Sequence, residues 1–459
     1  MDKREFLKAS GLALTGTMLS SFASDPSIAG QTPRDTARPA ATRTNWSGNY
    51  TYHTDRLDTP ADVEEVQAIV KRASKIRALG TRHSFNAIAD SPTEQISLQH
   101  LDQMTINAAA RTVTIGAGVT YGKLAPYIDS RGFALHNLAS LPHISVAGGC
   151  ATATHGSGIR NRNLSSACSG LDLITANGDR LTLSRAQDAE HFDGAVVALG
   201  ALGIVTSLTL DLQPTYQVEQ VVYQNLPFAE LEHNLDAIFS SGYSVSLFTD
   251  WQNGRATQVW IKRRVEPGKP YTWPQEFYNA ERATEKLHPI TGHPAEPCTE
   301  QLGIPGPWYE RLPHFRMNFT PSSGAELQTE YFVPRDNGYK AIRAVEELRD
   351  RITPHLLVTE LRTIESDSLW MSMAYHRPSL AIHFTWKPEW SAVRQILPLI
   401  EAKLAPFEPR PHWAKLFTLP PATLQSRYAK LADFKELLRQ HDSNGKFRNA
   451  FLETNLYTS

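Results

Sequence analysis

The spacing of apolar residues predicts short helices and strands that are mixed from the first folded segment onward. Val63, Val66 and Val70 recur at the interval of one helical face, and Thr59-Pro60 just before them has the residue types that begin helices. We therefore expect a helix capped by Thr59. A short apolar strand is expected over residues 76–79, where it ends at a glycine.

Further along, the same pattern predicts a strand over residues 112–115 and a helix over Tyr121–Asp129. Two apolar runs, 171–176 and 180–183, flank Asn177-Gly178, a dipeptide typical of a two-residue hairpin turn. This order of elements differs from the repeated strand–helix–strand unit of a doubly wound sheet. The pattern therefore indicates a mixture of α and β elements.

The pattern of apolar residues changes after Pro214. Runs typical of strands occupy residues 244–248, 258–261, 357–362 and 380–386, and residues 338–351 are expected to form a helix. A proline-rich passage over residues 266–313 has little regular pattern. Because a structureless loop of that length is uncommon inside a compact domain, we expect it to cover another part of the protein.

The first 29 residues differ in kind from the rest. Lys3-Arg4 precede a weakly apolar stretch rich in small residues, as in export signals. The Lys-Arg-x-Phe-Leu-Lys pattern is similar to a twin-arginine signal whose first arginine is replaced by lysine. This predicts an exported, periplasmic protein, and the alternative is a cytoplasmic protein with an uncleaved tail.

These patterns divide the chain into five segments. They are an export signal over residues 1–29, a linker over 30–44, a first domain over 45–215, a second domain over 216–419 and a C-terminal segment, 420–459, that returns to the first domain.

Composition argues against two kinds of partner. Of the 459 residues 20% are charged, and the formal net charge of −1 lacks the basic excess of nucleic-acid-binding proteins. No apolar run reaches the roughly 18 residues that a membrane-spanning helix needs. The three cysteines, Cys150, Cys168 and Cys298, have neither zinc-ribbon nor redox spacing, and we expect buried thiols.

Two glycine- and serine-rich turns have the composition of a cofactor cradle. Gly80–Asn86 follows a strand, and the second turn runs over residues 140–158. Such residues let a ligand approach the backbone N–H groups, which suit a pyrophosphate, although ordinary tight turns have the same composition. No G-x-G-x-x-G fingerprint occurs. His136, His143 and His155 match no metal-ligand spacing, so no metal is expected.

Polar residues at alternate positions of two apolar strands form a second candidate site. Glu360 and Arg362 share one strand face, as do His383 and Thr385, and Lys415 lies in a later apolar segment. Because charges are costly to bury unpaired, the plain alternative is a structural Glu–Arg pair or a solvated strand face. A site for a neutral polyol needs the same mixture of donors and acceptors.

Together these segments resemble the vanillyl-alcohol-oxidase-type flavoproteins, and within them the alditol (xylitol) oxidases. The resemblance extends from Asn45 to the C-terminus. It rests on Gly80–Asn86, Asn137–Gly158, Gly200–Thr206, Pro307-Trp308, Leu312–Phe315, Thr320–Leu327 and Arg410–Phe417. It implies an α+β fold of two domains, an FAD-binding domain and a substrate-binding cap domain built on an antiparallel sheet.

The resemblance also implies roles for particular residues. His83 would hold FAD covalently through the flavin 8α-methyl, and Ala139 would leave room for dioxygen. The other cofactor-binding positions would be Thr81, Arg82, Ser84, Ser140, Ser145, Gly148, Thr152, Ala153, Thr154, His155, Ile204 and Val205. The substrate-binding positions would be Ser140, Glu360, Arg362, Thr385 and Lys415. Arg82 replaces the glycine of the lactone-oxidising relatives, which would either crowd the His83 turn or add a phosphate contact.

The implied activity is oxidation of the terminal hydroxyl of an alditol, such as xylitol or sorbitol, to the aldose. Hydride would pass to flavin N5, and O2 would be reduced to H2O2. Arg362 and Lys415 would stabilise the developing alkoxide, and His383 would act as the general base. The resemblance also implies a monomer.

Three alternative functions remain open. A sugar-1,4-lactone oxidase or dehydrogenase of the same superfamily is the nearest. A metal-dependent polyol dehydrogenase with a nicotinamide cofactor is disfavoured by the missing dinucleotide fingerprint and ligand set. A non-catalytic, exported carbohydrate-binding protein would be colourless, whereas a flavoprotein would be yellow.

Overall fold

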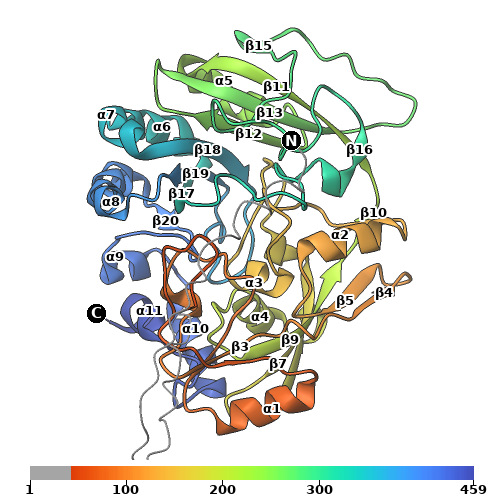
Figure 1. Ribbon diagram of the computed structural model, residues 1–459, viewed down its shortest axis with the longest axis vertical. Coiled ribbons are helices and arrows are strands. Elements are labelled where there is room, and N and C mark those ends of the chain that lie inside the picture. The colour runs from red at the N-terminus through yellow and green to blue at the C-terminus, as the bar shows by residue number, and fades with distance from the viewer. Residues whose placement is uncertain (1–42, 459) are drawn as a thin grey trace, which may run out of the picture. The chain divides into compact units, whose positions relative to one another are not determined.

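The computed structural model describes residues 43–458. The predicted export signal and most of the predicted linker therefore lie outside the described residues. In Figure 1 one large sheet occupies the upper part of the folded unit, and smaller sheets occupy the lower part. Among residues 43–458, no helix is both long and apolar enough to cross a bilayer.

The lower part is built mainly on two small sheets. One is parallel, with strands β1 (Leu57–Asp58), β2 (Ile76–Ala78) and β3 (Glu94–Ile96) in the order β1-β3-β2. The other is antiparallel, in the order β4-β5-β9-β7-β8. Its strands are β4 (Met104–Asn107), β5 (Thr112–Gly116), β7 (Cys168–Ile174), β8 (Arg180–Ser184) and β9 (Ile204–Asp211). The predicted hairpin at Asn177-Gly178 joins β7 to β8 and is confirmed.

The helices of this part begin where side chains cap them. Helix α2 (Tyr121–Asp129) has the predicted bounds, and Thr120 caps it. The predicted cap of α1 (Val63–Arg72) is wrong, because Asp62 and not Thr59 precedes the first turn. Asp62 Oδ1 accepts a hydrogen bond from the Glu65 N–H (2.8 Å), and Glu65 Oε2 accepts one from the Ala61 N–H (2.8 Å). This reciprocal pair satisfies two free backbone donors, which Thr59 lies too early to reach.

The remaining helices of the lower part are short. They are α3 (Val146–Ala151), α4 (Arg185–Val196), α9 (Pro421–Ser426), α10 (Leu431–His441) and α11 (Ala450–Leu452).

The upper part is one sheet, to which ten of the described strands belong. Their order is β14-β15-β11-β13-β12-β18-β19-β17-β20, with β16 paired to β11, and all the pairs are antiparallel. The strands are β11 (Gln217–Pro227), β12 (Ser244–Thr249), β13 (Arg255–Arg264), β14 (Glu276–Phe277), β15 (Ala280–Arg282), β16 (Gly306–Pro307), β17 (Leu327–Pro334), β18 (Leu356–Ile364), β19 (Ser379–Trp386) and β20 (Arg410–Pro411).

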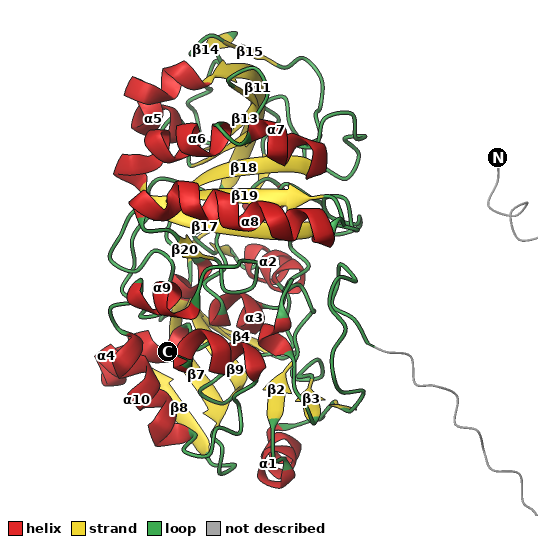
Figure 2. Ribbon diagram, turned by 90° about the vertical axis from the view of Figure 1, so that its left-hand side faces the viewer, coloured by secondary structure: helices red, strands yellow, loops and turns green. Residues whose placement is uncertain are grey.

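Helices cover one face of this sheet, as Figure 2 shows. They are α5 (Leu231–Phe239), α6 (Gly338–Glu346), α7 (Arg349–Ile352) and α8 (Trp390–Leu404). The prediction of one helix over residues 338–351 is wrong, because the chain turns at Glu347-Leu348 between α6 and α7. The Leu348 N–H bonds three residues back, to the Val345 carbonyl, which ends the α-helical ladder. The turn lets Leu348 and Ile352 both pack on the apolar core beneath the helices.

The opposite face of the sheet carries a row of side chains that crosses five neighbouring strands. Strand register places Gln258 opposite Phe248, Phe248 opposite Glu360, Glu360 opposite His383, and His383 opposite Glu330. Residues that are directly paired point to the same side of a sheet. All five side chains are buried, so this polar row faces protein and not bulk solvent.

The C-terminal segment packs against the lower part. The buried Arg77 donates hydrogen bonds to the carbonyls of Phe447 (2.8 Å) and Gly200 (2.7 Å). Asn449 Nδ2 donates to the Ala87 (2.9 Å) and Asp90 (2.8 Å) carbonyls. These contacts lie where the sequence predicts the return of the chain, and the exact domain boundaries stay predictions.

Candidate active site

A cavity of about 670 Å³ lies between the two glycine-rich turns of the lower part and the polar row of the large sheet. Its walls include residues from Gly80–Phe85, from 139–155 and from four strands of that sheet. Pro289 and Ile290 also line it, so the proline-rich passage covers one end of the cavity. The cavity therefore brings together the two groups of residues that the sequence singles out.

His83 lies on the cavity wall in a defined orientation. Its ring stacks on Trp46 with centroids 5.2 Å apart, and its Nδ1 is 3.0 Å from Thr81 Oγ1. Its buried Nε2 has no hydrogen-bond partner among the described residues. Burial lowers the pKa of His83 to about 3, with smaller contributions from His143 and Lys415. The imidazole is therefore neutral at pH 7 and has a free ring nitrogen.

The two turns are fastened to each other and to the segment that carries Lys415. The Ser145 N–H donates to Thr81 Oγ1 (3.1 Å). Asn86 Nδ2 donates to the Lys415 carbonyl (2.7 Å), and the Phe85 N–H donates to the Ala414 carbonyl (2.7 Å). The turn that carries His83 thus also fixes the backbone of Lys415.

Most of the predicted cofactor-binding residues line the cavity. They are Thr81, Arg82, His83, Ser84, Ser140, Ser145, Gly148, Thr152, Thr154, His155 and Val205. Ala153 and Ile204 do not line it, because their buried side chains pack into apolar clusters. Ala139 lies on the wall beside Ser140.

Arg82 has a left-handed backbone conformation, with φ of 65°. This conformation explains why a glycine is favourable at this position. The exposed Arg82 side chain donates to the Thr44 carbonyl (3.1 Å). The guanidinium group is therefore already engaged on the side of the turn where residues 44–46 lie.

On the sheet side, Arg362 is the centre of a buried ionic cluster. Its Nη2 is 2.6 Å from Glu330 Oε1, whereas its Nε is 3.7 Å from Glu360 Oε2. Burial alone would raise the pKa of Glu330, but Arg362 and His155 hold it well below the usual range. The structural Glu–Arg pair that the sequence leaves open therefore exists, and Arg362 forms it with two carboxylates, closely with Glu330 and at a longer distance with Glu360. Arg362 Nη1 also donates to Ser140 Oγ (3.3 Å).

Gln328 fixes the proton positions of the second group. Its Oε1 accepts hydrogen bonds from His383 Nε2 (3.1 Å) and from Lys415 Nζ. His383 must therefore have its ring proton on Nε2, which leaves the Nδ1 lone pair free, 3.9 Å from Glu360 Oε2. Burial lowers the pKa of His383 to about 3 and that of Lys415 to about 8. Thr385 lies next to His383 on the same face and also lines the cavity.

His155, Glu330 and His412 offer the one grouping in the described chain that matches a metal site by distance. The hydrogen bonds of these residues argue against metal binding. His412 Nδ1 accepts from the Ala414 N–H (3.1 Å), so its proton is on Nε2, the nitrogen that would have to bind the metal. Glu330 already has the Arg362 guanidinium as its cation. His136 and His143 lie apart from this group and bond to the Arg162 and Met317 carbonyls.

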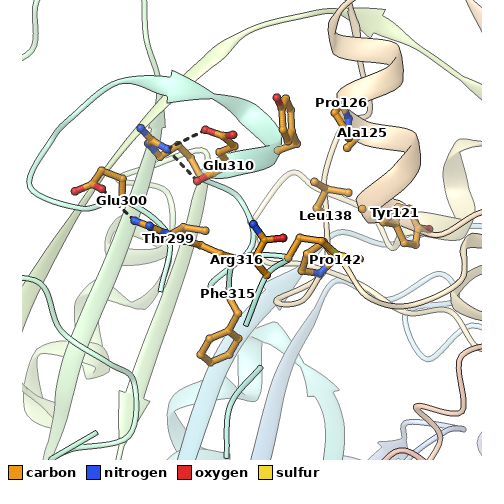
Figure 3. A pocket seen from close by; sticks show the side chains of 15 residues that line it. Tyr121, Ala125, Pro126, Leu138, Pro142, Thr299, Glu300, Glu310, Phe315 and Arg316 are labelled. Atoms are coloured by element: carbon orange, nitrogen blue, oxygen red, sulfur yellow. Dashed lines mark hydrogen bonds and ion pairs between the residues drawn. The ribbon is translucent and has the colours of Figure 1, made fainter. Parts of the chain in front are cut away.

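A second pocket, of about 460 Å³, lies between α2 and the loop over residues 299–318. Figure 3 shows Arg316 beside Glu300, and these two residues form an ion pair (3.1 Å). Arg311 also lies near Glu310 (4.0 Å). None of the predicted site residues lines this pocket.

Comparison with known proteins agrees with the two halves of this cavity. The family model of the FAD binding domain matches residues 54–184, and the model of D-arabinono-1,4-lactone oxidase matches residues 324–455. An alditol oxidase from Streptomyces is 45% identical over 414 residues, which cover 89% of this chain and 97% of that protein. The chain belongs to the alditol oxidase family.

More distant relatives of this alditol oxidase family member act on lactones. An L-gulono-1,4-lactone dehydrogenase from Mycobacterium tuberculosis is 26% identical and covers 89% of this chain and 97% of its own length. L-gulonolactone oxidase from Bos taurus is 24% identical and covers 90% of this chain and 98% of its own length. The lactone alternative is thus supported only at lower identity.

The fold is shared with a solved structure. The crystal structure of cholesterol oxidase from B. sterolicum superposes with a TM-score of 0.73 at 15% identity, over 94% of this chain and 100% of that one. Together with the FAD-binding model, this likeness confirms the predicted α+β, two-domain architecture with an antiparallel cap sheet.

The sequence analysis missed four residues of this alditol-oxidase-type cavity: Gln328, Glu330, His314 and His412. Gln328 and Glu330 alternate within the apolar strand β17, which is the same signal that reveals Glu360 and Arg362. His314 and His412 lie outside the long strands, so no periodic pattern distinguishes them.

Proposed function

We propose that the protein oxidises the terminal hydroxyl of an alditol to the aldose, with FAD attached to His83 and with O2 reduced to H2O2. The observation that carries the proposal is the cavity that has His83 on one wall and Glu360, Arg362, His383 and Lys415 on the other. The identity to the Streptomyces alditol oxidase supports the substrate class.

Attachment at His83 is supported by the state of its ring. The pKa of His83 is lowered to about 3, so the imidazole keeps a lone pair at neutral pH, and its buried Nε2 is unpartnered among the described residues. A neutral nitrogen with a free lone pair is what bond formation to the flavin 8α-methyl requires. Gly148 lines the same cavity and has no side chain, so a ligand can approach its backbone.

The bound FAD supplies the two-electron acceptor of the reaction. Glu360, an ionised carboxylate with one oxygen free of close partners, accepts hydrogen bonds from neighbouring substrate hydroxyls and fixes which carbon reacts. Arg362 and Lys415 donate to the reacting oxygen and stabilise the negative charge that develops on it. His383 Nδ1 is the acceptor for the hydroxyl proton, because Gln328 holds the other ring nitrogen as a donor. Burial lowers the pKa of His383 to about 3, so it is a weaker base than an exposed imidazole.

A lactone oxidase is the second candidate, because the D-arabinono-1,4-lactone oxidase model matches residues 324–455. The two functions differ in the group at carbon 1. Both substrates carry adjacent hydroxyls that can donate to a carboxylate, but carbon 1 of an open-chain alditol carries a hydroxyl, whereas carbon 1 of a lactone is a ring carbonyl, which cannot donate.

Oxygen uptake by the purified protein tests the choice. We expect uptake with xylitol or sorbitol, half of it returned on adding catalase, and little uptake with gulono-1,4-lactone. Glu360→Gln should lose most of the activity on alditols. Turnover of the lactone with no turnover of any alditol would overturn the proposal.

We also propose export through a twin-arginine-like signal, on the sequence features of the first 29 residues, and a monomeric state, on the family resemblance alone. Fractionation of cells and light scattering of the purified protein would test these two predictions.

A further inference from the structure

We propose that His314, held in place by Lys262, is a positioning residue that orients Glu360 toward the substrate. The inference rests on the proposed function, in which Glu360 binds substrate hydroxyls. Neither Lys262 nor His314 belongs to the predicted site, and His314 contributes to the cavity wall from a loop.

His314 lies between the two walls of the cavity. Its backbone N–H donates to the Ser140 carbonyl (2.8 Å), on the side of the glycine-rich turns. Its buried ring lies edge-on to Phe248 and Trp260, with centroids 5.4 Å and 5.1 Å away. These contacts fix the plane of the imidazole, so its two nitrogens have fixed directions.

One nitrogen points to Glu360 and the other to Lys262. His314 Nε2 is 2.8 Å from Glu360 Oε1, and Lys262 Nζ is 3.1 Å from His314 Nδ1. Lys262 Nζ also donates to the Leu312 (2.5 Å) and Pro313 (3.2 Å) carbonyls. An ammonium group has three protons and no lone pair, and here it has three acceptors. Glu360 is ionised and can only accept, so the ring proton of the neutral His314 is on Nε2, where it is donated to Glu360, and Nδ1 accepts from Lys262.

Lys262 is an unusual residue for this location. It is almost fully buried, and no carboxylate contacts its ammonium group among the described residues. Burying an ammonium group is costly, and burial lowers the pKa of Lys262 to about 7. The nearest compensating charge is Glu360, reached through the His314 ring, so the lysine and the substrate-binding carboxylate are coupled by one imidazole.

The two carboxylate oxygens of Glu360 therefore have different roles. Oε1 is occupied by His314, whereas Oε2 lies 3.7 Å from Arg362 Nε and 3.9 Å from His383 Nδ1, beyond hydrogen-bond distance. Oε2 is therefore left for the substrate. Without the His314 donor, Glu360 is free to turn toward Arg362, and the oxygen that binds substrate is lost.

The test compares variants at position 314 in the flavin-loaded protein. His314→Gln keeps a donor near the Nε2 position, whereas His314→Asn keeps a polar group of similar kind that is too short to reach Glu360. We expect His314→Asn to raise KM for xylitol about 10- to 100-fold, the usual cost of a lost hydrogen bond to a charged group, with a smaller change in kcat. His314→Gln should recover most of the affinity, and Lys262→Met should resemble His314→Asn.

A double-mutant cycle with Glu360→Gln shows whether His314 acts through Glu360. We expect His314→Asn to add little to the KM of Glu360→Gln, because the oxygen that it orients is already altered. Flavin content and the thermal unfolding midpoint report whether each variant is folded. If His314→Asn does not fold, Lys262→Met takes its place in the test of the positioning role.

The outcomes separate the two claims. A wild-type protein that oxidises no alditol overturns the proposed function, and this role with it. An active wild-type protein whose KM is unchanged by His314→Asn and by Lys262→Met overturns the positioning role alone. Additive effects of His314→Asn and Glu360→Gln would also overturn it, because they would show that His314 acts independently of Glu360.

Discussion

The two walls of the cavity are formed by different kinds of residue. The wall that carries His83 consists of turns with glycine, serine and threonine, in which neutral groups and backbone amides lie close together. The opposite wall is one face of a sheet that carries the buried Glu330, Glu360 and Arg362, together with Lys415 from the segment after β20. Close packing of small residues determines the structure of the first wall, and the balance of buried charges determines that of the second.

This difference determines which substitutions each wall tolerates. An added methyl group matters where backbone segments approach closely, whereas a removed charge matters where ions are buried together. Substitutions in the two walls should therefore have different effects.

The largest effect is expected on the charged wall, from Arg362→Met. This change leaves the buried Glu330 and Glu360 carboxylates without their shared cation. Breaking a buried ion pair on one side costs about 3–5 kcal/mol of the free energy of unfolding, and alditol oxidation should be lost as well. Urea unfolding measures the first effect and oxygen uptake the second. Arg439→Met, at an exposed pair with Glu436, is the control and should leave the urea midpoint unchanged.

The next effect concerns pH, and it arises from Lys415. Its pKa is lowered to about 8 by burial, and the protonated form is the one that stabilises the alkoxide, so kcat should fall as pH rises through about 8. His383, with a pKa of about 3, stays neutral above pH 5 and adds no acid-side loss there. Lys415→Arg should remove the alkaline fall. Lys262 acts on KM, so a kcat profile that still falls near pH 8 in Lys415→Arg would contradict this assignment.

Directly behind the neutral wall, in the second glycine-rich turn, Gly156→Ala should have a moderate effect. A Cβ at Gly156 would overlap the Leu138 carbonyl oxygen and lie 2.7 Å from Asn137 Nδ2. Overpacking of this kind costs about 1–3 kcal/mol of unfolding free energy, and flavin incorporation should fall with it. Gly149→Ala is the matched control, because the nearest atoms to its Cβ would be side-chain atoms of Tyr121 at 3.3 Å and Ile144 at 3.6 Å, with no backbone overlap. Equal losses in both variants would mean that close packing is not what sets this wall apart.

The smallest effect is expected from Arg82→Gly. Glycine relieves the left-handed conformation of residue 82, so the unfolding free energy should increase by up to about 1 kcal/mol. The hydrogen bond that is lost, to the Thr44 carbonyl, is exposed. Thermal unfolding and the content of bound flavin check this. A loss of flavin would show that the guanidinium contacts the cofactor. It would contradict the view that Arg82 bonds only to the Thr44 carbonyl.

The same contrast explains what the sequence could predict. Each turn of the neutral wall is a continuous stretch of the chain, so Gly80–Asn86 and residues 140–158 are visible as local composition. Within strands, alternation identified Glu360 with Arg362 and His383 with Thr385. Helix α2 and the hairpin at Asn177-Gly178 were likewise predicted, because their caps and turns are local.

The charged wall depends on contacts between segments far apart in sequence. Glu330 becomes the partner of Arg362 only because β19 lies between β17 and β18 in register. The role of His314 depends on where a loop crosses the sheet. The start of α1 was misjudged for a different reason, since two side chains compete to cap it and the reciprocal pair of Asp62 and Glu65 prevails.

The most direct test of the account is the attachment of flavin to His83. The purified protein is precipitated with acid, and flavin absorbance is measured in the pellet and in the supernatant, alongside His83→Ala. The account predicts flavin in the wild-type pellet and none in the pellet of His83→Ala. Flavin found only in the wild-type supernatant would contradict it, because the cofactor would then be bound without a bond to His83.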